Sequence, residues 1–485
     1  MIGPYKQWPK PVRVALLTLG DGGQPLLLDE KLRTRTLAEL QAEPRWRIYT
    51  SPVTVRDLLH RDVGELLTWN GEQSRYRLQR VEGPGWKPQE HDIRVLNLPF
   101  PEDALQALRA LRRWRDWLWR YGAVPGSIGQ ASWSLLRATL ERPFWTNMGE
   151  PPPISFTVGG RIQMLAAQGE YQGKLAHLDL PAAYGSTLGE LLYGGRWRHL
   201  KPTEAAHWGN VGLPLFLRAR VRVPEGAPCG PLIRRPRKRP TLLQGLFFPA
   251  EYPRGVTLQG VWTHEELMVA RAYGCHVAEL EAWLHMPARR ADGMGYEQPF
   301  LPWWQAIQEG RRMQGFAGKL AKACGNALWG QFAIEPGKRV VVTLEGRGER
   351  RRRLVRDASF SEHAGRPPAH DLTETVCGRV RAQLTQMMLA TGGALLCVHT
   401  DGGWLDERAF PELDALEGWR VKERARKLRL LNPSRLAYDD GKQMRYVTSG
   451  WTREQAEEHF ESHWQAFEWE RDRQQAFAER RRRSH

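Results

Sequence analysis

The chain has 485 residues, more than one hydrophobic core usually serves, so two or three domains are expected. Its 41% hydrophobic and 26% charged residues are typical of a soluble globular protein, and no apolar run approaches the roughly 18 residues that a membrane helix needs. The net charge of +17 favours a polyanionic partner, whose counterions are released on binding. The first ten residues lack the apolar core of a secretory signal, so we expect a cytoplasmic protein without a membrane partner.

The placement of cysteine and of basic residues narrows the class of partner. The five cysteines are scattered without a C-x-x-C pair, which argues against a zinc site and against a disulfide framework. The basic residues gather in clusters, and such clustering favours nucleic acid over simple solubility. The clusters lie at residues 234–239, 350–353, 422–429 and 480–483.

The N-terminal part mixes strand and helix signals, which suits a three-layer α/β domain. A glycine-rich turn at residues 20–23 separates two apolar stretches. Strands are expected over residues 12–19, 25–28 and 45–50, and a helix over residues 55–67.

Two helices are expected next. Leucine and tryptophan recur at helical spacing over residues 102–120, so this helix buries one apolar side. A second helix over residues 131–140 leads to prolines at 151–153, which mark a domain boundary. The arginines of the first helix are expected in solvent or near a nucleic acid; they are Arg109, Arg112, Arg113 and Arg115.

The middle of the chain places an acid at the end of a strand. Strand signals over residues 158–180 include a short apolar run that leads to Asp179, and Tyr184 follows five positions later. Mixed strand signals then continue from residue 195 to about residue 290.

Residues 303–332 are expected to form two antiparallel helices joined near Gly310 or Gly315. Lys322 and Asn326 stand four positions apart in the second helix and therefore on one of its faces. Further along, a hairpin is expected over residues 340–344 and 352–355, and an amphipathic helix over residues 372–390.

Residues 394–398 are apolar without alternation, which indicates a buried strand. Thr400 and Asp401 follow, and Gly402 with Gly403 suits a two-residue hairpin turn. A rigid hairpin would then hold the carboxylate of Asp401 in a fixed position. The alternative is that Asp401 only serves the turn, since Asp before Gly favours turns without any chemistry.

Three of these stretches, taken together, resemble the polymerase motifs of family B DNA polymerases. The family patterns are D-x-x-S-L-Y-P-S, K-x-x-x-N-S-x-Y-G and Y-x-D-T-D-S, and here they occur in the same order. Residues 260–274 also resemble the stretch ahead of the fingers in the protein-primed branch. The matching positions are Asp179, Tyr184 and Ser186; Lys322, Asn326, Trp329 and Gly330; and Thr400 with Asp401.

The resemblance implies an α/β and α+β multidomain fold, a right-hand polymerase behind an N-terminal exonuclease-like α/β domain. Residues 173–179 would form a central strand of the palm. The implied division is an exonuclease-like domain at 1–150, a first palm part with an inserted subdomain at 151–300, fingers at 301–332, a second palm part at 333–430, and a reduced thumb with a basic tail at 431–485.

The exonuclease-like domain is expected to be inactive, so the protein would lack 3′-5′ proofreading. The family's exonuclease holds two metal ions with four carboxylates, but Thr18 and Leu19 stand where its first acids belong. Asp103 could serve as the last acid, yet Pro99 occupies the place of the family's tyrosine. An unrelated N-terminal domain is the alternative.

The resemblance further implies template-directed DNA synthesis from dNTPs on a DNA primer-template, with Mg²⁺ as cofactor and Mn²⁺ as a possible substitute. Asp179 and Asp401 would bind the metal ions, with the backbone carbonyl of Leu180 as a further ligand. His399 replaces the first acid of the D-T-D pattern, and an imidazole is a poor Mg²⁺ ligand.

Other positions take their implied roles from the family. Tyr184 would lie under the sugar and exclude a 2′-hydroxyl, and Gly330 would let the backbone approach the base. Residues 435–438 resemble the K-x-Y region that binds the primer strand, although its lysines are missing. Lys322 with Arg311 or Arg312 would bind the triphosphate, Asn326 and Trp329 would lie along the nascent base pair, and Thr400, Arg435 and Tyr438 would contact the primer.

Two questions stay open at this point. A non-catalytic nucleic-acid-binding protein on a decayed polymerase scaffold is the alternative function, because His399 and other motif residues are altered and the thumb is small. The way in which synthesis is primed is also open, so a priming protein or a processivity partner is a further expected partner.

Overall fold

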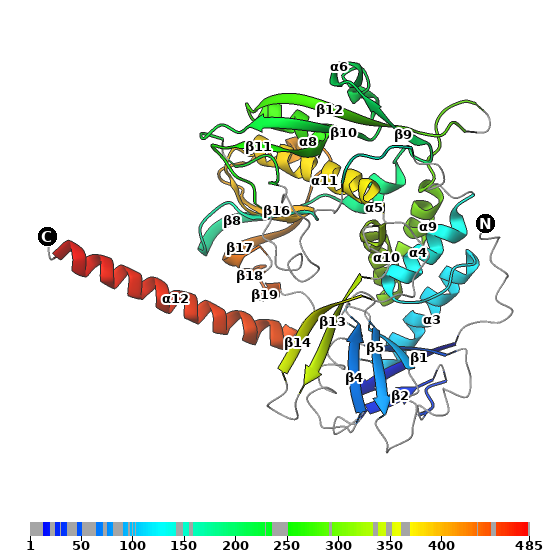
Figure 1. Cartoon of the computed structure of the whole chain (residues 1–485). Coiled ribbons are helices and arrows are strands. Elements are labelled where there is room, and N and C mark those ends of the chain that lie inside the picture. The colour runs from blue at the N-terminus through cyan, green and yellow to red at the C-terminus, as the bar shows by residue number, and fades with distance from the viewer. Residues whose placement is uncertain are drawn as a thin grey trace. The chain divides into compact units, whose positions relative to one another are not determined.

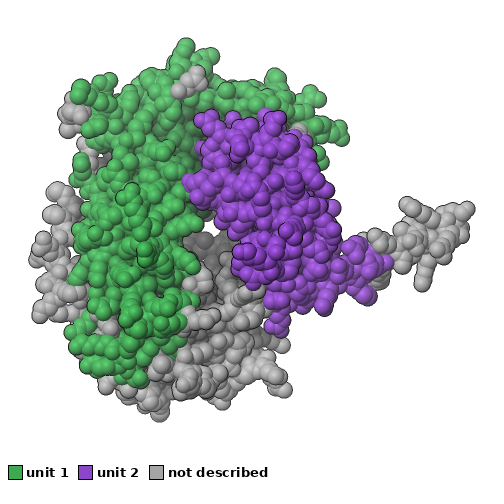
Figure 2. Space-filling view, turned by 180° about the vertical axis from the view of Figure 1, so that it is seen from behind, with its two compact units in different colours: residues 1–159, 182–382 green, residues 160–181, 383–485 purple. Residues whose placement is uncertain are grey.

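The computed structural model divides into two compact units, each with its own sheets. Unit 1 comprises residues 1–159 and 182–382, and unit 2 comprises residues 160–181 and 383–485 (Figure 2). The mixed α/β class predicted from the sequence is confirmed. The structure describes residues 13–19, 25–29, 31–35, 46–50, 65–70, 75–80, 91–95, 98, 100–101, 103–141, 149–154, 159–227, 229–234, 251–290, 293–332, 338–345, 352–359, 369–433, 435–447 and 453–483.

The N-terminal sheet of unit 1 has the strand order β14-β13-β4-β5-β6-β3-β1-β2. Strand β1 pairs antiparallel with β2 and parallel with β3, and β3 in turn pairs parallel with β6. The three strands predicted for this region are therefore confirmed. The members are β1 (Arg13–Leu19), β2 (Pro25–Leu28), β3 (Trp46–Thr50), β4 (Glu65–Asn70), β5 (Arg75–Arg80), β6 (His91–Val95), β13 (Lys338–Glu345) and β14 (Arg352–Ser359).

Two features of this sheet differ from the sequence prediction or extend it. The helix predicted for residues 55–67 is wrong at its end, because residues 65–67 belong to β4 and pair with β5. The predicted hairpin, β13 with β14, is confirmed, and it pairs with β4 through Val341 and Val342. It thus extends the N-terminal sheet, although the sequence grouped it with the second palm part. The predicted features at residues 20–23, 55–64, 99, 235–239 and 350–351 lie outside the described residues.

Four helices pack together in unit 1: α3 (Ala104–Arg120), α4 (Ile128–Thr139), α9 (Leu301–Arg311) and α10 (Phe316–Phe332). Helix α10 contacts the other three, and a Cβ at Gly310 would lie 2.8 Å from that of Ala321. Gly315, at φ +69°, lies in the short link between α9 and α10, as predicted. Arg115 is only 7% exposed, lies on the buried side of α3 and pairs with Asp116. The prediction that Arg115 lies in solvent or near a nucleic acid is therefore wrong.

A second sheet of unit 1 is antiparallel throughout and carries the mixed strand signals after residue 195. Its order is β11-β10-β12-β9, and helix α8 (His264–Ala272) follows β11 (Figure 1). A capping box between Thr263 and Glu266 starts α8. The strands are β9 (Arg196–Leu200), β10 (Leu215–Arg222), β11 (Thr257–Thr263) and β12 (His276–Met286), and short helices form at α5 (Ala183–Gly189) and α6 (Pro202–Ala205).

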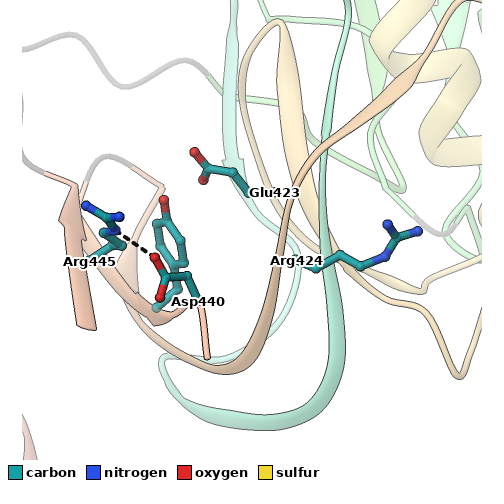
Figure 3. Close-up of a pocket in the computed structure, with 5 residues that line it drawn as sticks. Glu423, Arg424, Asp440 and Arg445 are labelled. Carbon is teal, nitrogen blue, oxygen red and sulfur yellow. Dashed lines mark hydrogen bonds and ion pairs between the residues drawn. The ribbon is translucent and has the colours of Figure 1, made fainter. Parts of the chain in front are cut away.

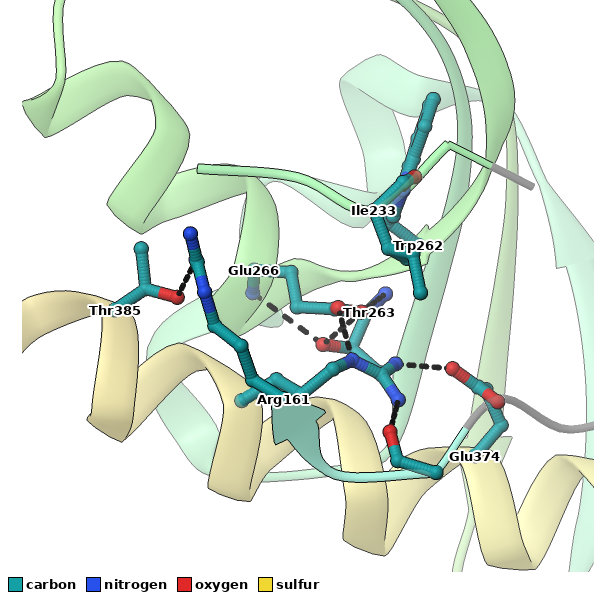
Figure 4. A network of polar contacts seen from close by, with 9 residues as sticks. Arg161, Ile233, Trp262, Thr263, Glu266, Glu374 and Thr385 are labelled. Atoms are coloured by element: carbon teal, nitrogen blue, oxygen red, sulfur yellow. Dashed lines mark hydrogen bonds and ion pairs between the residues drawn. The ribbon is translucent and has the colours of Figure 1, made fainter. Parts of the chain in front are cut away.

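A buried ion cluster of unit 1 joins α8 to the first part of α11 (His370–Ala390), whose residues 383–390 belong to unit 2. Arg381 is 2% exposed and donates to Glu266 at 2.9 Å and to Glu374 (Figure 4). Both acids are almost fully buried as well. Removal of one partner would leave an uncompensated buried charge, so the cluster fixes how the two helices pack. Helix α11 confirms the helix predicted for residues 372–390, but almost all of its side chains are buried, so the prediction that it is amphipathic is wrong.

Unit 2 is built on a seven-stranded antiparallel sheet of order β19-β18-β17-β8-β16-β15-β7. The predicted central strand, β8, lies in the middle of this sheet between β17 and β16. Leu175, Trp404 and Leu428 belong to the apolar cluster that packs on one face. The strands are β7 (Arg161–Met164), β8 (Gly169–Asp179), β15 (Leu395–Thr400), β16 (Gly402–Asp406), β17 (Arg420–Asn432), β18 (Arg435–Asp439) and β19 (Met444–Val447).

The C-terminal helix of unit 2, α12 (Arg453–Arg483), is the long red helix of Figure 1. Its first half is anchored to the sheet, because Phe460 and Trp464 are buried against Leu431 and Ala437. Among the described residues, no helix combines the length and the apolarity needed to cross a bilayer.

Candidate active site

The two predicted metal-binding acids come together in the sheet of unit 2. Asp179 is the last residue of β8 and lies opposite Gly402, the first residue of β16. Asp401 immediately precedes Gly402, and the backbone N–H of Leu180 donates to the Asp401 carbonyl at 2.8 Å. The end of β8 and the hairpin therefore present both carboxylates from adjoining backbone.

The turn of this hairpin is shifted from its predicted position. His399 pairs with Gly402, so the two-residue turn consists of Thr400 and Asp401, with Thr400 at φ +56°. Gly402 and Gly403 lie instead in buried β16. A Cβ at Gly402 would lie 2.5 Å from the Leu178 carbonyl oxygen, so glycine is needed there for strand contact and not for the turn.

The two carboxylates have different partners. Asp401 accepts a hydrogen bond from the Thr400 hydroxyl at 2.7 Å. Asp179 accepts from Arg420, at 2.8 Å from Nη2 and 3.2 Å from Nε, and Lys422 Nζ lies 3.8 Å from its other oxygen. The sequence analysis placed Lys422 in a basic cluster but assigned neither cation to Asp179, since only strand pairing shows that Arg420 lies opposite Asp179.

The donor set suits a hard divalent cation. The carboxylates of Asp179 and Asp401 and the carbonyl of Leu180 all offer oxygen, the atom that Mg²⁺ prefers. Two basic side chains contact Asp179, so a metal ion would have to compete with them for the carboxylate oxygens. No group of three or more His, Cys, Asp or Glu side chains with metal-binding placement occurs among the described residues.

His177, two residues before Asp179, supports the acid from the same strand. Its ring stacks on Trp404 with centroids 5.1 Å apart and planes 11° apart. Burial lowers the pKa of His177 to about 4, and the neighbouring Lys422 contributes to the shift. The ring is therefore neutral near pH 7 and adds no charge beside the carboxylate. His399 is exposed.

Unit 1 brings together two other predicted site residues. Tyr184 of α5 stacks on Trp329 of α10, with ring centroids 4.8 Å apart and planes 20° apart. Gly185 and Gly189 of α5 face the Trp304 side chain, which a Cβ at Gly185 would approach to 2.5 Å. Trp304 thus explains why a small residue stands at 185, where the family pattern has proline.

Helix α10 presents its remaining predicted residues to solvent. Lys322 and Asn326 are exposed and form no hydrogen bond or ion pair with any described residue. Trp329 follows Lys322 by seven positions, about two helical turns, so both lie on one helix face. Arg311 lies over the Trp304 ring at 6.0 Å, and Arg312 is exposed. Gly330 faces open space.

Tyr438, predicted to contact the primer, lines a pocket of about 390 Å³ in unit 2. The pocket also involves Glu423, Arg424, Asp440 and Arg445, and Arg445 donates to Asp440 at 2.8 Å (Figure 3). Burial and a hydrogen bond with Glu423 raise the pKa of the Tyr438 phenol, which stays protonated. Arg435 of the same strand is partly buried.

Two described acids of the N-terminal region, Asp103 and Asp29, have structural partners. Asp103 caps α3 by accepting the Leu105 N–H at 2.8 Å. Asp29 is 1% exposed; its burial favours a higher pKa, but hydrogen bonds from Arg33 and Arg35 lower it to about 2. Each of these carboxylates therefore already has a defined role in the fold.

The fold is that of a DNA polymerase. Solved structures of phi29 DNA polymerase, a protein-primed family B polymerase, match almost the whole chain at 12% identity. The orthorhombic crystal form matches with a TM-score of 0.58 over 92% of this chain and 94% of that chain. The complex with primer-template DNA and incoming nucleotide substrates has a TM-score of 0.57 over 93% and 94%, and the complex with single-stranded DNA has 0.55 over 92% and 94%.

The resemblance predicted from the sequence is thus confirmed at the level of the fold. No family model and no curated protein matches this sequence.

Proposed function

We propose that this chain is a template-directed DNA polymerase of the family B type, which adds dNTPs to a primer 3′-hydroxyl by two-metal-ion nucleotidyl transfer. One observation carries the proposal: Asp179 and Asp401 lie on adjoining backbone in a chain that has the fold of phi29 DNA polymerase. Residues 151–300 and 333–430 would then form the palm, except for β13 and β14, which belong to the N-terminal sheet. Residues 301–332 would form the fingers and residues 431–485 the reduced thumb.

The metal-binding residues of this proposal are Asp179, Asp401 and the carbonyl of Leu180. They would hold divalent ions, Mg²⁺ with Mn²⁺ as a substitute. When bound, such ions neutralise the α-phosphate and lower the pKa of the attacking hydroxyl. The neutral ring of His177 packs against Trp404 and keeps the end of β8 in place without competing for those ions.

The residues of α5 and α10 would bind the incoming nucleotide. The exposed Lys322 offers a point charge to the triphosphate, assisted by Arg311 or Arg312. Asn326 would lie along the nascent pair. The Tyr184 ring is held by its stack on Trp329, and a ring fixed in this way can exclude a 2′-hydroxyl better than a mobile one.

The primer strand and the N-terminal domain complete the proposal. Thr400, Arg435 and Tyr438 would contact the primer, Tyr438 through its hydroxyl oxygen because its proton is donated to Glu423. The protein would lack 3′-5′ proofreading. Strand β1 carries no acidic residue, and Asp103 caps a helix, which supports this part of the proposal.

The test is primer extension with a labelled primer-template, dNTPs and Mg²⁺ or Mn²⁺, comparing the wild type with Asp179→Ala and Asp401→Ala. Both substitutions are expected to abolish extension. Asp406→Ala is the matched control, because Asp406 is an aspartate at the far end of β16 that pairs with Arg408. Equal extension by the wild type and both active-site variants would refute the assigned pair.

Three additional reactions test the remaining parts. Degradation of the 3′ end without dNTPs would contradict the inactive exonuclease. Synthesis without a primer, or after addition of a protein hydroxyl donor, would show how chains start. Tight DNA binding without extension under any condition would favour the alternative, a nucleic-acid-binding protein on a decayed scaffold, which the altered position His399 also supports.

A further inference from the structure

Asp179 has a basic partner at each of its carboxylate oxygens. Arg420 donates to Oδ2 at 2.8 and 3.2 Å, and Lys422 Nζ lies 3.8 Å from Oδ1. All three residues belong to the sheet of unit 2, where Arg420 lies directly opposite Asp179 in the pairing of β17 with β8. These cations contact the atoms that a divalent ion would need.

The other candidate ligand is not blocked in this way. The Asp401 carboxylate accepts from the Thr400 hydroxyl and has no ion pair with any described residue. Asp401 is therefore open to a metal ion, while the charge of Asp179 is already balanced by Arg420 and Lys422. This difference arises from two side chains of β17, so the motif residues alone could not have predicted it.

The pairing is weak enough to be exchanged. The Arg420 side chain is 53% exposed and that of Lys422 is 44% exposed, so both reach water without movement of β17. Exposed ion pairs contribute little stability, so Arg420 and Lys422 can leave the Asp179 oxygens when another group takes up their charge. An ion that displaces them leaves two positive groups beside it, and those groups then need an anion.

We propose that Arg420 and Lys422 keep Asp179 closed to free divalent ions and open it to a metal–nucleoside triphosphate complex, whose phosphates take over the two basic groups. This inference rests on the polymerase proposed above and adds how its substrate enters. Metal and nucleotide then bind with positive coupling. The phosphates neutralise the two basic groups that the metal displaces, and the metal frees those groups to bind the phosphates. Arg420 and Lys422 act as positioning residues, since they select the form in which the metal arrives.

The test measures Mn²⁺ binding to the full chain by the electron paramagnetic resonance signal of free Mn²⁺, with and without a dNTP. We expect weak binding of free Mn²⁺ to the wild type and much tighter binding with the dNTP. Arg420→Gln should tighten binding of free Mn²⁺ by roughly three- to tenfold and reduce the enhancement by dNTP. Lys422→Gln should act in the same direction with a smaller effect.

Two controls separate competition from structural damage. Arg420→Lys keeps a cation and should bind Mn²⁺ as the wild type does. If Arg420 and Lys422 had only a structural role, neither Arg420→Gln nor Lys422→Gln would change the affinity for Mn²⁺. Arg408→Gln removes an arginine of similar exposure that pairs with Asp406 in the same unit, and it should leave Mn²⁺ binding unchanged. A thermal melt checks that each variant is folded.

The outcomes distinguish this inference from the proposed function. Unchanged or weaker binding of free Mn²⁺ by both Gln variants, in a protein that extends primers, overturns the inference alone. If Asp179→Ala causes no loss of Mn²⁺ binding, with or without a dNTP, the proposed metal site is wrong and the polymerase proposal fails with it.

Discussion

Tyr184 and Trp329 stack with ring centroids 4.8 Å apart, although one belongs to α5 and the other to α10. The contact joins two motifs that are far apart in the sequence, and it gives the tyrosine ring a fixed platform. Aromatic pairs of this kind contribute about 0.5–1.5 kcal/mol beyond the burial of their area. The platform makes the orientation of Tyr184 depend on the size of residue 329.

The first prediction concerns sugar selection. Tyr184→Ala should raise the use of ribonucleotides relative to deoxyribonucleotides by at least about tenfold, because a fixed ring that excludes the 2′-hydroxyl is lost. Trp329→Ala should have a smaller effect in the same direction, since the ring loses its platform. Tyr184→Phe keeps the stack and serves as the control. Equal ratios of incorporation in the wild type and Tyr184→Ala would contradict the assigned role.

The second prediction concerns the exposed lysine of α10. Lys322→Gln should raise the KM for dNTPs at least about tenfold, because a charge that contacts the triphosphate contributes roughly 1.5–3 kcal/mol. Steady-state extension with varied dNTP measures this change. Lys201→Gln, which removes an exposed lysine elsewhere in unit 1, is the matched control and should leave the KM unchanged. A KM of Lys322→Gln equal to that of the control would assign Lys322 to the solvated surface.

The third prediction separates stability from activity at Gly330. A Cβ at this helical position meets no atom within 4 Å, so Gly330→Ala should fold and raise the free energy of unfolding by about 0.5–1 kcal/mol. The same methyl group should reduce primer extension, because the backbone can no longer approach the base closely. Urea unfolding and extension are measured on one preparation. Full activity in the stabilised variant would show that no close approach occurs there.

The sequence predicted those features that depend on neighbours along the chain. The apolar run before Asp179 and the spacing of Lys322 and Asn326 are local patterns, and both form the elements expected.

Features that depend on strand pairing could not be predicted in the same way. Gly402 was assigned to a turn because the glycine pair fits one, but contact with the Leu178 carbonyl places it in β16. Arg420 escaped notice because its position opposite Asp179 follows from the register of β17, which no local pattern encodes. The end of the helix expected over residues 55–67 was wrong for the same reason, since residues 65–67 pair with β5 and this pairing outweighs local periodicity.

The fourth prediction concerns pH and His285 in unit 1. This side chain is 0% exposed, stacks on Tyr193 at 4.0 Å and contacts Trp197 edge-on, and neither ring nitrogen has a hydrogen-bond partner among the described residues. Asp371 is the charged group behind this cluster and accepts from Tyr193 and Trp197. Burial lowers the pKa of His285 from 6.5 to about 3.

The sign of the effect follows from proton binding. Between about pH 6.5 and pH 3 the unfolded chain protonates His285 and the folded chain does not, so the free energy of unfolding falls as the pH falls. The slope for this one group approaches about 1.4 kcal/mol per pH unit below 6.5. His285→Phe keeps the ring stack and removes the proton site, so its stability should fall less between about pH 7 and about pH 5. Urea unfolding at both values measures the difference, and an equal loss in the wild type and His285→Phe would show that His285 is not buried as a neutral ring.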